Sequence, residues 1–118
     1  MKVQGVHHVS INVDDVGTAK QFYTKILGLT ERMDRPDFGF GGAWLDAGGQ
    51  RVHLISGQTP PAKGQHFALR VDDLASVISE LRSRGIDVSD AVPVATSLQA
   101  FLQDPSGNQI ELHQVGAV

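Results

Sequence analysis

The sequence lacks cysteine altogether across its 118 residues. Disulfide bonds, thiolate zinc sites and a cysteine nucleophile are therefore excluded, and any metal must be held by nitrogen and oxygen donors. There is no apolar run long enough to cross a bilayer and no segment of signal-peptide form, so we expect a cytoplasmic protein without a membrane partner. Basic residues are not in excess either, because 10 Lys and Arg stand against 13 Asp and Glu. A net charge of −3 gives no electrostatic footprint for nucleic acid.

What the sequence does have is the composition of a globular protein. Apolar residues make up 41% of the chain and charged residues 19%, which is far from the balance of a disordered chain. The length suits one domain with a sizeable core. We therefore expect residues 1–118 to form a single domain.

A short pattern occurs twice at a fixed spacing. Residues 8–15 (HVSINVDD) match residues 66–73 (HFALRVDD), an offset of 58 (66 − 8). The same offset carries residues 49–54 (GQRVHL) onto residues 107–112 (GNQIEL). The sequence therefore predicts two copies of one structural unit.

The matched positions of this repeat include four potential metal ligands. His8 corresponds to His66, and His53 corresponds to Glu111. A single histidine in a strand is more often solvated or hydrogen-bonded than a ligand, but four candidates at matched positions favour a metal site. Three imidazoles and a carboxylate suit a divalent transition ion such as Zn²⁺, Ni²⁺, Co²⁺, Fe²⁺ or Mn²⁺.

Hydrophobic periodicity predicts the same order of elements in each half. Alternation over residues 3–13 indicates a strand, and helical spacing over residues 16–27 follows a possible cap at Asp14 or Asp15 and ends before Gly28. In the second half a helix follows Asp73 and stops at Gly85. The other expected strands lie near residues 29–33, 40–46, 51–56, 66–71, 87–93, 99–103 and 109–114.

We therefore predict an α+β fold of two tandem βαβββ modules. The modules span residues 1–56 and 65–118, and the Gly- and Pro-rich residues 57–64 form the linker. In each module one helix covers one face of the sheet, so the other face must be covered by something else, and the second copy is the natural partner. Strand alternation puts His8, His53, His66 and Glu111 on that second face, lining a groove shared by the two sheets.

Further residues have two interpretations each. His7 falls on the core side of the alternation, so we expect it to be a partly buried, hydrogen-bonded histidine. His113 shares a face with Glu111 and is expected to support it or to line the pocket. Aromatic side chains fit either a pocket wall or the core, and arginines fit either an anion-binding role or a solvated strand edge; these are Phe38, Phe40 and Trp44, and Arg35, Arg51 and Arg70.

These motifs resemble the vicinal oxygen chelate superfamily, which includes glyoxalase I, methylmalonyl-CoA epimerase, extradiol dioxygenases, fosfomycin-resistance transferases and bleomycin-resistance proteins. The resemblance covers nearly the whole chain. It rests on His8-Val9-Ser10, Leu27-Gly28-Leu29, His66-Phe67-Ala68-Leu69, Asp104-Pro105-Ser106-Gly107-Asn108 and Ile110-Glu111-Leu112. The resemblance implies paired βαβββ modules, metal ligands at His8, His53, His66 and Glu111, a small-molecule substrate and frequent dimerisation, so we expect a homodimer.

The chain departs from the glyoxalase I pattern at one ligand. That enzyme usually has a carboxylate where His53 stands, so Glu111 is the only carboxylate left to move a proton. We expect a metal-dependent glyoxalase- or epimerase-like lyase or isomerase that acts on a small oxygen-chelating carbonyl compound. The alternatives are an Fe(II)-dependent extradiol-type dioxygenase, which a fourth ligand at His53 disfavours, and a non-catalytic drug-binding resistance protein, which does not need the ligand set. A thiol transferase is a further possibility, for which no phosphonate pocket is evident in the sequence.

Overall fold

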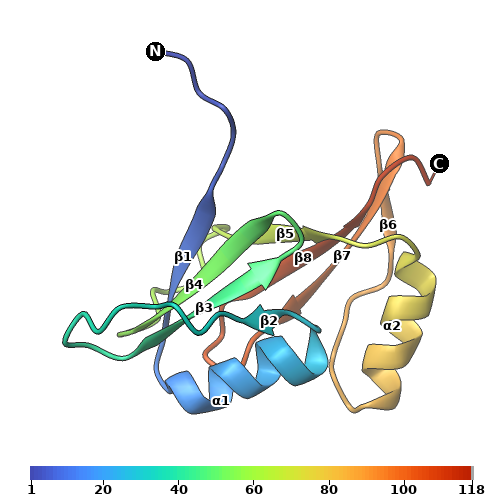
Figure 1. Ribbon diagram of the computed structural model, residues 1–118. Helices are drawn as coiled ribbons and strands as arrows, with labels where there is room; N and C mark the ends of the chain where they lie inside the picture. Colours follow the sequence, from blue (N-terminus) through green and yellow to red (C-terminus); the bar gives the residue numbers. More distant parts are fainter. Residues whose placement is uncertain (118) are drawn as a thin grey trace. The chain divides into compact units, whose positions relative to one another are not determined.

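A computed structural model describes residues 1–117, which separate into two compact units. The first unit is Met1–Pro61, and the second begins at Ala62. Each unit contains one four-stranded sheet and one helical segment after its first strand (Figure 1). The structure therefore confirms the α+β fold with two βαβββ modules.

The first unit begins its sheet with β1 (His8–Val13), which leads into α1 (Val16–Gln21) and the π-helical turn η1 (Phe22–Ile26). Three strands follow, β2 (Thr30–Glu31), β3 (Gly42–Ala47) and β4 (Gln50–Ser56). The strand order is β1-β4-β3-β2, with β1 parallel to β4 and the other neighbours antiparallel. The first and last strands of the unit are therefore neighbours in the sheet.

The second unit repeats this arrangement. Its elements are β5 (Phe67–Arg70), α2 (Leu74–Ser83), β6 (Val92–Val94), β7 (Ser97–Gln103) and β8 (Gln109–Gln114). The strand order is β5-β8-β7-β6, again with a parallel first pair and antiparallel neighbours after it. The repeat extends to the register: Ser10 pairs with His53 in the first unit, and Ala68 pairs with Glu111, each 58 positions later (68 − 10 and 111 − 53), in the second.

The helix boundaries follow from local chemistry. The carboxylate of Asp15 accepts a hydrogen bond from the backbone N–H of Thr18 at 2.9 Å, and Asp73 accepts one from Ser76 at 3.2 Å. These N-caps satisfy backbone donors that have no partner within the helix. Gly28 and Gly85 both have φ of +78°, a left-handed conformation that glycine adopts easily at a helix end.

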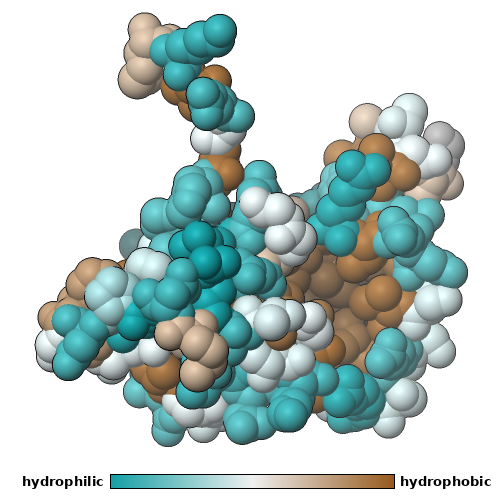
Figure 2. Space-filling model, in the orientation of Figure 1, coloured by the Kyte–Doolittle hydropathy of each residue, from teal (hydrophilic) through white to brown (hydrophobic). Residues whose placement is uncertain are grey.

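Two predictions of secondary structure in the first unit were wrong, and in the second unit the strand expected near residues 87–93 is found at Val92–Val94 instead. The first strand begins at His8 rather than at residue 3, and the preceding residues project from the first unit (Figures 1 and 2). The helix expected over residues 16–27 also changes its winding, because the Leu27 N–H bonds to the Phe22 carbonyl five residues back. Hydrophobic spacing alone does not distinguish an α-helical turn from this wider π-helical one.

Each unit has its own hydrophobic core between its helix and its sheet. Tyr23, Leu45 and Leu54 are the largest fully buried side chains of the first unit, and Leu74, Ile110 and Leu112 are those of the second. The strand residues among them alternate with the positions of the candidate ligands. Packing in the core thereby fixes which face the ligands occupy. Within residues 1–117 no helix is both long and apolar enough to cross a membrane.

Candidate metal centre

The first unit brings His8 and His53 together. Their rings stack with centroids 3.9 Å apart and planes inclined by 17°. The parallel register of β1 and β4 explains this, since His53 lies beside Ser10, two residues along the same strand face from His8. Trp44, directly opposite His53 on β3, stacks on the same imidazole with centroids 4.7 Å apart. The sheet therefore holds His53 between two other rings.

His53 is buried and has an unsatisfied nitrogen. The His53 residue is only 8% exposed, and its Nε2 atom is buried without a hydrogen-bond partner. Burial, and then electrostatic interactions with His8 and Arg51, lower the pKa of His53 to about 4. The imidazole is therefore neutral at neutral pH, which is the form that binds metals. A buried imidazole nitrogen without a partner has the chemistry of a metal ligand.

The second unit brings His66 and Glu111 together. His66 Nε2 lies 3.1 Å from Glu111 Oε1, and His66 Nδ1 donates to the Gly64 carbonyl at 2.8 Å. The Gly64 hydrogen bond and then the Glu111 carboxylate raise the pKa of His66. Fixing Nδ1 on a backbone carbonyl leaves Nε2 as the nitrogen for a ligand, an arrangement common around metal-binding histidines.

Glu111 is held on its other side by His113. His113 Nδ1 lies 2.7 Å from Glu111 Oε2, and Glu111 itself is only 8% exposed. The strand that carries both starts at a tight turn in which buried Asp104 accepts hydrogen bonds from the N–H groups of Ser106 and Asn108, each at 2.9 Å. Both carboxylate oxygens of Glu111 are thus in defined positions, as the supporting role expected for His113 requires.

The remaining candidates have different surroundings. The Arg51 guanidinium lies over the Trp44 ring, 5.5 Å from its centroid, and the same ring stacks on His53. Arg70 is exposed on β5, opposite His113 in register. His7 is exposed, with its Nδ1 2.9 Å from that of His8, so the prediction of a partly buried residue was wrong. It precedes β1, where strand alternation no longer determines the direction of a side chain.

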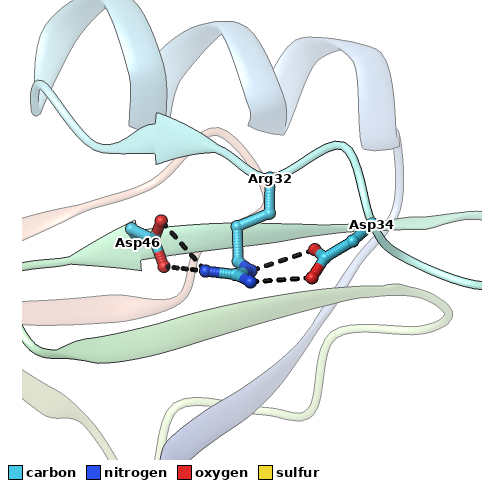
Figure 3. Close-up of polar contacts among 3 residues, drawn as sticks. All are labelled: Arg32, Asp34 and Asp46. Atoms are coloured by element: carbon cyan, nitrogen blue, oxygen red, sulfur yellow. Dashed lines mark hydrogen bonds and ion pairs between the residues drawn. The ribbon is translucent and has the colours of Figure 1, made fainter.

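One polar network was not predicted from the sequence. The Arg32 guanidinium contacts Asp34 at 2.7 Å and Asp46 at 3.2 Å, linking the loop after β2 to β3 (Figure 3). These contacts lower the pKa of Asp34, chiefly through its hydrogen bond to Arg32. Asp34 lies in a loop without periodicity, and Asp46 comes near only through strand pairing. The alternating charge of residues 31–35 was the only available signal.

The candidate ligands therefore form two pairs, one in each unit. We name His8 and His53 the first-unit pair, and His66 and Glu111 the second-unit pair. Within residues 1–117, no group of three or more His, Asp or Glu side chains is gathered in a way that could hold a metal ion. The convergence of all four ligands on one ion stays a prediction, whereas the proximity within each pair is a feature of the structure.

The donor chemistry fits a divalent transition ion. The first-unit pair supplies a neutral buried imidazole and a second ring stacked on it. The second-unit pair supplies an imidazole fixed through its other nitrogen and a carboxylate oxygen. Nitrogen and oxygen donors of this kind bind Zn²⁺, Ni²⁺, Co²⁺, Fe²⁺ and Mn²⁺.

Comparison with known proteins identifies the family of the chain. The family model described as the glyoxalase/bleomycin resistance protein/dioxygenase superfamily matches residues 5–112. The lactoylglutathione lyase of Escherichia coli is 31% identical over 120 residues, which cover 89% of this chain and 88% of that protein. A crystal structure of a glyoxalase-family protein from Bacillus anthracis superposes with a TM-score of 0.88 at 28% identity, covering 98% of both chains. An antibiotic-binding protein from a Streptomyces species superposes with a TM-score of 0.83 at 27% identity, covering 98% of both. The chain therefore belongs to the glyoxalase/bleomycin resistance protein/dioxygenase superfamily.

Proposed function

We propose that this protein is a metal-dependent lyase or isomerase of the glyoxalase or epimerase type, acting on a small carbonyl compound that chelates the metal through two oxygens. The observation that carries the proposal is the buried, unpartnered Nε2 of His53 beside His8, matched in the second unit by His66 and Glu111. A native fold rarely leaves a buried polar atom unsatisfied without a reason.

The proposed ligands of the ion are His8, His53, His66 and Glu111. A single ion with these four ligands needs one first-unit pair and one second-unit pair. The homodimer that we also propose contains two first-unit pairs and two second-unit pairs. It therefore has ligands for two ions, which is one ion per chain. When bound, the metal supplies Lewis-acid polarisation of the substrate oxygens, which favours loss of a proton from the neighbouring carbon.

Glu111 is the proposed base. It is the only carboxylate among the four ligand positions, so it accepts the proton from the carbon beside the carbonyl and returns it to form the product. His113 is a positioning residue in this scheme, because its 2.7 Å contact holds Oε2 of Glu111 and fixes the direction of Oε1. The buried position of Glu111 limits competition from water for the same proton.

Metal titration with complementary variants tests the proposal. Wild-type protein is expected to bind Co²⁺ or Ni²⁺ with a defined stoichiometry, while His8→Ala/His53→Ala and His66→Ala/Glu111→Gln each lose binding. A wild-type protein that binds neither ion overturns the metal site. Mixing the two double variants then shows which chains contribute: binding returns in the mixture if one site takes its two pairs from different chains, and stays absent if both pairs come from one chain.

A binding role without turnover is the second candidate. It is favoured by the structural likeness to an antibiotic-binding protein and by the exposed aromatic rings of the loop between β2 and β3. The four donor residues disfavour it, since sequestering a ligand does not require them. Exchange of the proton beside the carbonyl into deuterated water, measured with metal-loaded protein and a set of 2-hydroxy- and 2-oxo-carbonyl compounds, separates the two roles.

A further inference from the structure

A series of neighbouring aromatic rings leads outward from the first-unit pair. Trp44 stacks on His53, Phe38 lies with its centroid 6.1 Å from that of Trp44, and Phe40 stacks on Phe38 at 5.6 Å with planes inclined by 17°. Phe38 is 49% exposed and Phe40 is 51% exposed. Both belong to the loop between β2 and β3, where neighbouring exposed aromatic side chains indicate a binding surface rather than core packing.

Two guanidinium groups lie against these rings. Arg35 is 5.1 Å from the centroid of Phe38 and 5.6 Å from that of Phe40, and Arg51 is 5.5 Å from that of Trp44. In the part of the chain that the structure describes, neither arginine forms an ion pair, whereas neighbouring Arg32 contacts two carboxylates. Arg51 does attract the Asp34 carboxylate, but at longer range than an ion pair. Two guanidinium charges that lie beside aromatic faces and outside ion pairs suit an anionic, flat ligand.

The loop holds Arg35 in place. Its Nη2 donates to the Phe40 carbonyl at 3.0 Å, so the guanidinium closes the turn that carries both phenylalanines. Gly42 leaves the space that this arrangement needs, because a Cβ atom there would lie 2.9 Å from Arg35 Nη2 and would also collide with the Leu54 carbonyl. Arg32 anchors the base of the loop through Asp34 and Asp46. The rings and charges therefore belong to a supported structure.

We propose that this ring cluster (Phe38, Phe40 and Trp44 with Arg35 and Arg51) binds the body of the substrate, and that the substrate is an aromatic or similarly flat, conjugated compound with an anionic group. The rings stack on its flat face and the two guanidinium groups pair with its negative charge. This inference rests on the proposed function for the chelating end of the substrate. The recognition of ring and charge does not depend on a metal.

The single tryptophan of the chain provides a local probe. In a ¹H–¹⁵N spectrum of metal-free protein, the Trp44 indole N–H gives one signal that reports binding at the ring cluster. Benzoate is compared with cyclohexanecarboxylate, which has the charge without the aromatic ring, and with benzyl alcohol, which has the ring without the charge. We expect saturable shifts with benzoate, at an affinity roughly tenfold or more above that of either control compound.

Variants test whether benzoate binding depends on an arginine of the ring cluster or only on the net charge of the protein. Arg51→Gln removes one positive charge and leaves the Arg35 hydrogen bond to Phe40 in place, so it is expected to weaken benzoate binding roughly tenfold and to leave benzyl alcohol binding unchanged. Arg84→Gln, on the exposed end of α2, is the matched control and is expected to leave benzoate binding unchanged. Equal affinities for the three compounds, no saturable shift with any of them, or equal effects of the two kinds of variant overturn the inference.

A metal-loaded series distinguishes this inference from the proposed function. With Zn²⁺-loaded protein, 3,4-dihydroxybenzoate adds two vicinal oxygens to the ring and charge of benzoate, and glycolate keeps oxygens without the ring. If the protein binds no metal but still selects benzoate, the proposed function fails and the ring cluster stands. If Zn²⁺ binds and glycolate binds the Zn²⁺-loaded protein as tightly as 3,4-dihydroxybenzoate does, the ring cluster does not contribute to the affinity and this inference fails.

Discussion

Replacing His53 by phenylalanine is expected to stabilise the metal-free protein while removing its response to metal. The wild-type side chain leaves a buried Nε2 atom without a partner, and an unsatisfied buried polar group costs about 1–3 kcal/mol. Phenylalanine keeps the ring between His8 and Trp44 and has no polar atom. Strain from its larger volume offsets part of the gain, so we expect a net increase of about 1 kcal/mol in the free energy of unfolding, or roughly 4 °C in Tm.

The assay is chemical and thermal unfolding with and without metal. At a free metal concentration of about 100 times the Kd, wild-type protein gains about 2.7 kcal/mol from binding, whereas His53→Phe gains far less. His8→Phe is the matched control: it changes the other ring of the same pair, but His8 is exposed and has no buried orphan atom. We expect this control to lose the metal response without gaining stability in the metal-free form.

The dependence on pH provides a second check on the same residue. In the folded protein the pKa of His53 is lowered from its ordinary value of 6.5 to about 4. As pH falls, His53 therefore takes up a proton in the unfolded chain before it does so in the folded chain. The free energy of unfolding of the metal-free wild type consequently decreases between pH 6.5 and about 4, and this decrease is absent from His53→Phe. Subtracting the two profiles cancels the other titrating groups. A variant that is less stable than wild type and has a parallel pH profile would refute the role assigned to Nε2.

Other variants test the second unit and the loop. Glu111→Gln removes the proposed base together with a proposed metal ligand and should lower turnover by at least about 10²–10⁴-fold, measured at the same excess of metal as for the wild type; unchanged turnover excludes Glu111 from both roles. His113→Phe removes the 2.7 Å contact to Glu111 and should weaken metal affinity by about 10–100-fold by calorimetry, with His113→Asn expected to recover part of the loss. Gly42→Ala places a Cβ against Arg35 and Leu54 and should lower the free energy of unfolding by about 1–3 kcal/mol; an unchanged melting curve means that the loop adjusts without cost.

Much of the fold could be predicted because the signals are local. Alternation in β1, β4, β5 and β8, the caps at Asp15 and Asp73 and the glycines that end the helices depend on residues within a few positions of one another. The 58-residue offset between the two halves predicted that His8 corresponds to His66 and His53 to Glu111. The register of β1 with β4 and of β5 with β8 agrees with this offset. The proximity of His8 to His53 follows from that pairing.

Features that depend on tertiary neighbours could not be predicted. Alternation placed His53 on the face away from the core, but it is buried because Trp44 on the adjacent strand covers it. His7 lies outside the strand, so the alternation that was applied to it has no physical basis there. Three members of the ring cluster, Phe38, Phe40 and Arg35, lie on a loop whose shape depends on Arg32 and Gly42. The sequence left its aromatic residues equally compatible with the core or with a pocket wall.

Metal content is the most direct test of the central claim that the two histidine-containing pairs hold one divalent transition ion. Protein dialysed against Co²⁺ is expected to retain a single ion per chain by elemental analysis, with an absorption spectrum that shows histidine nitrogen ligands. That ion should be lost from His53→Phe and from Glu111→Gln alike, since one variant alters each unit. Wild-type protein without bound metal, or a Co²⁺ spectrum that is the same in both variants as in the wild type, would contradict the account.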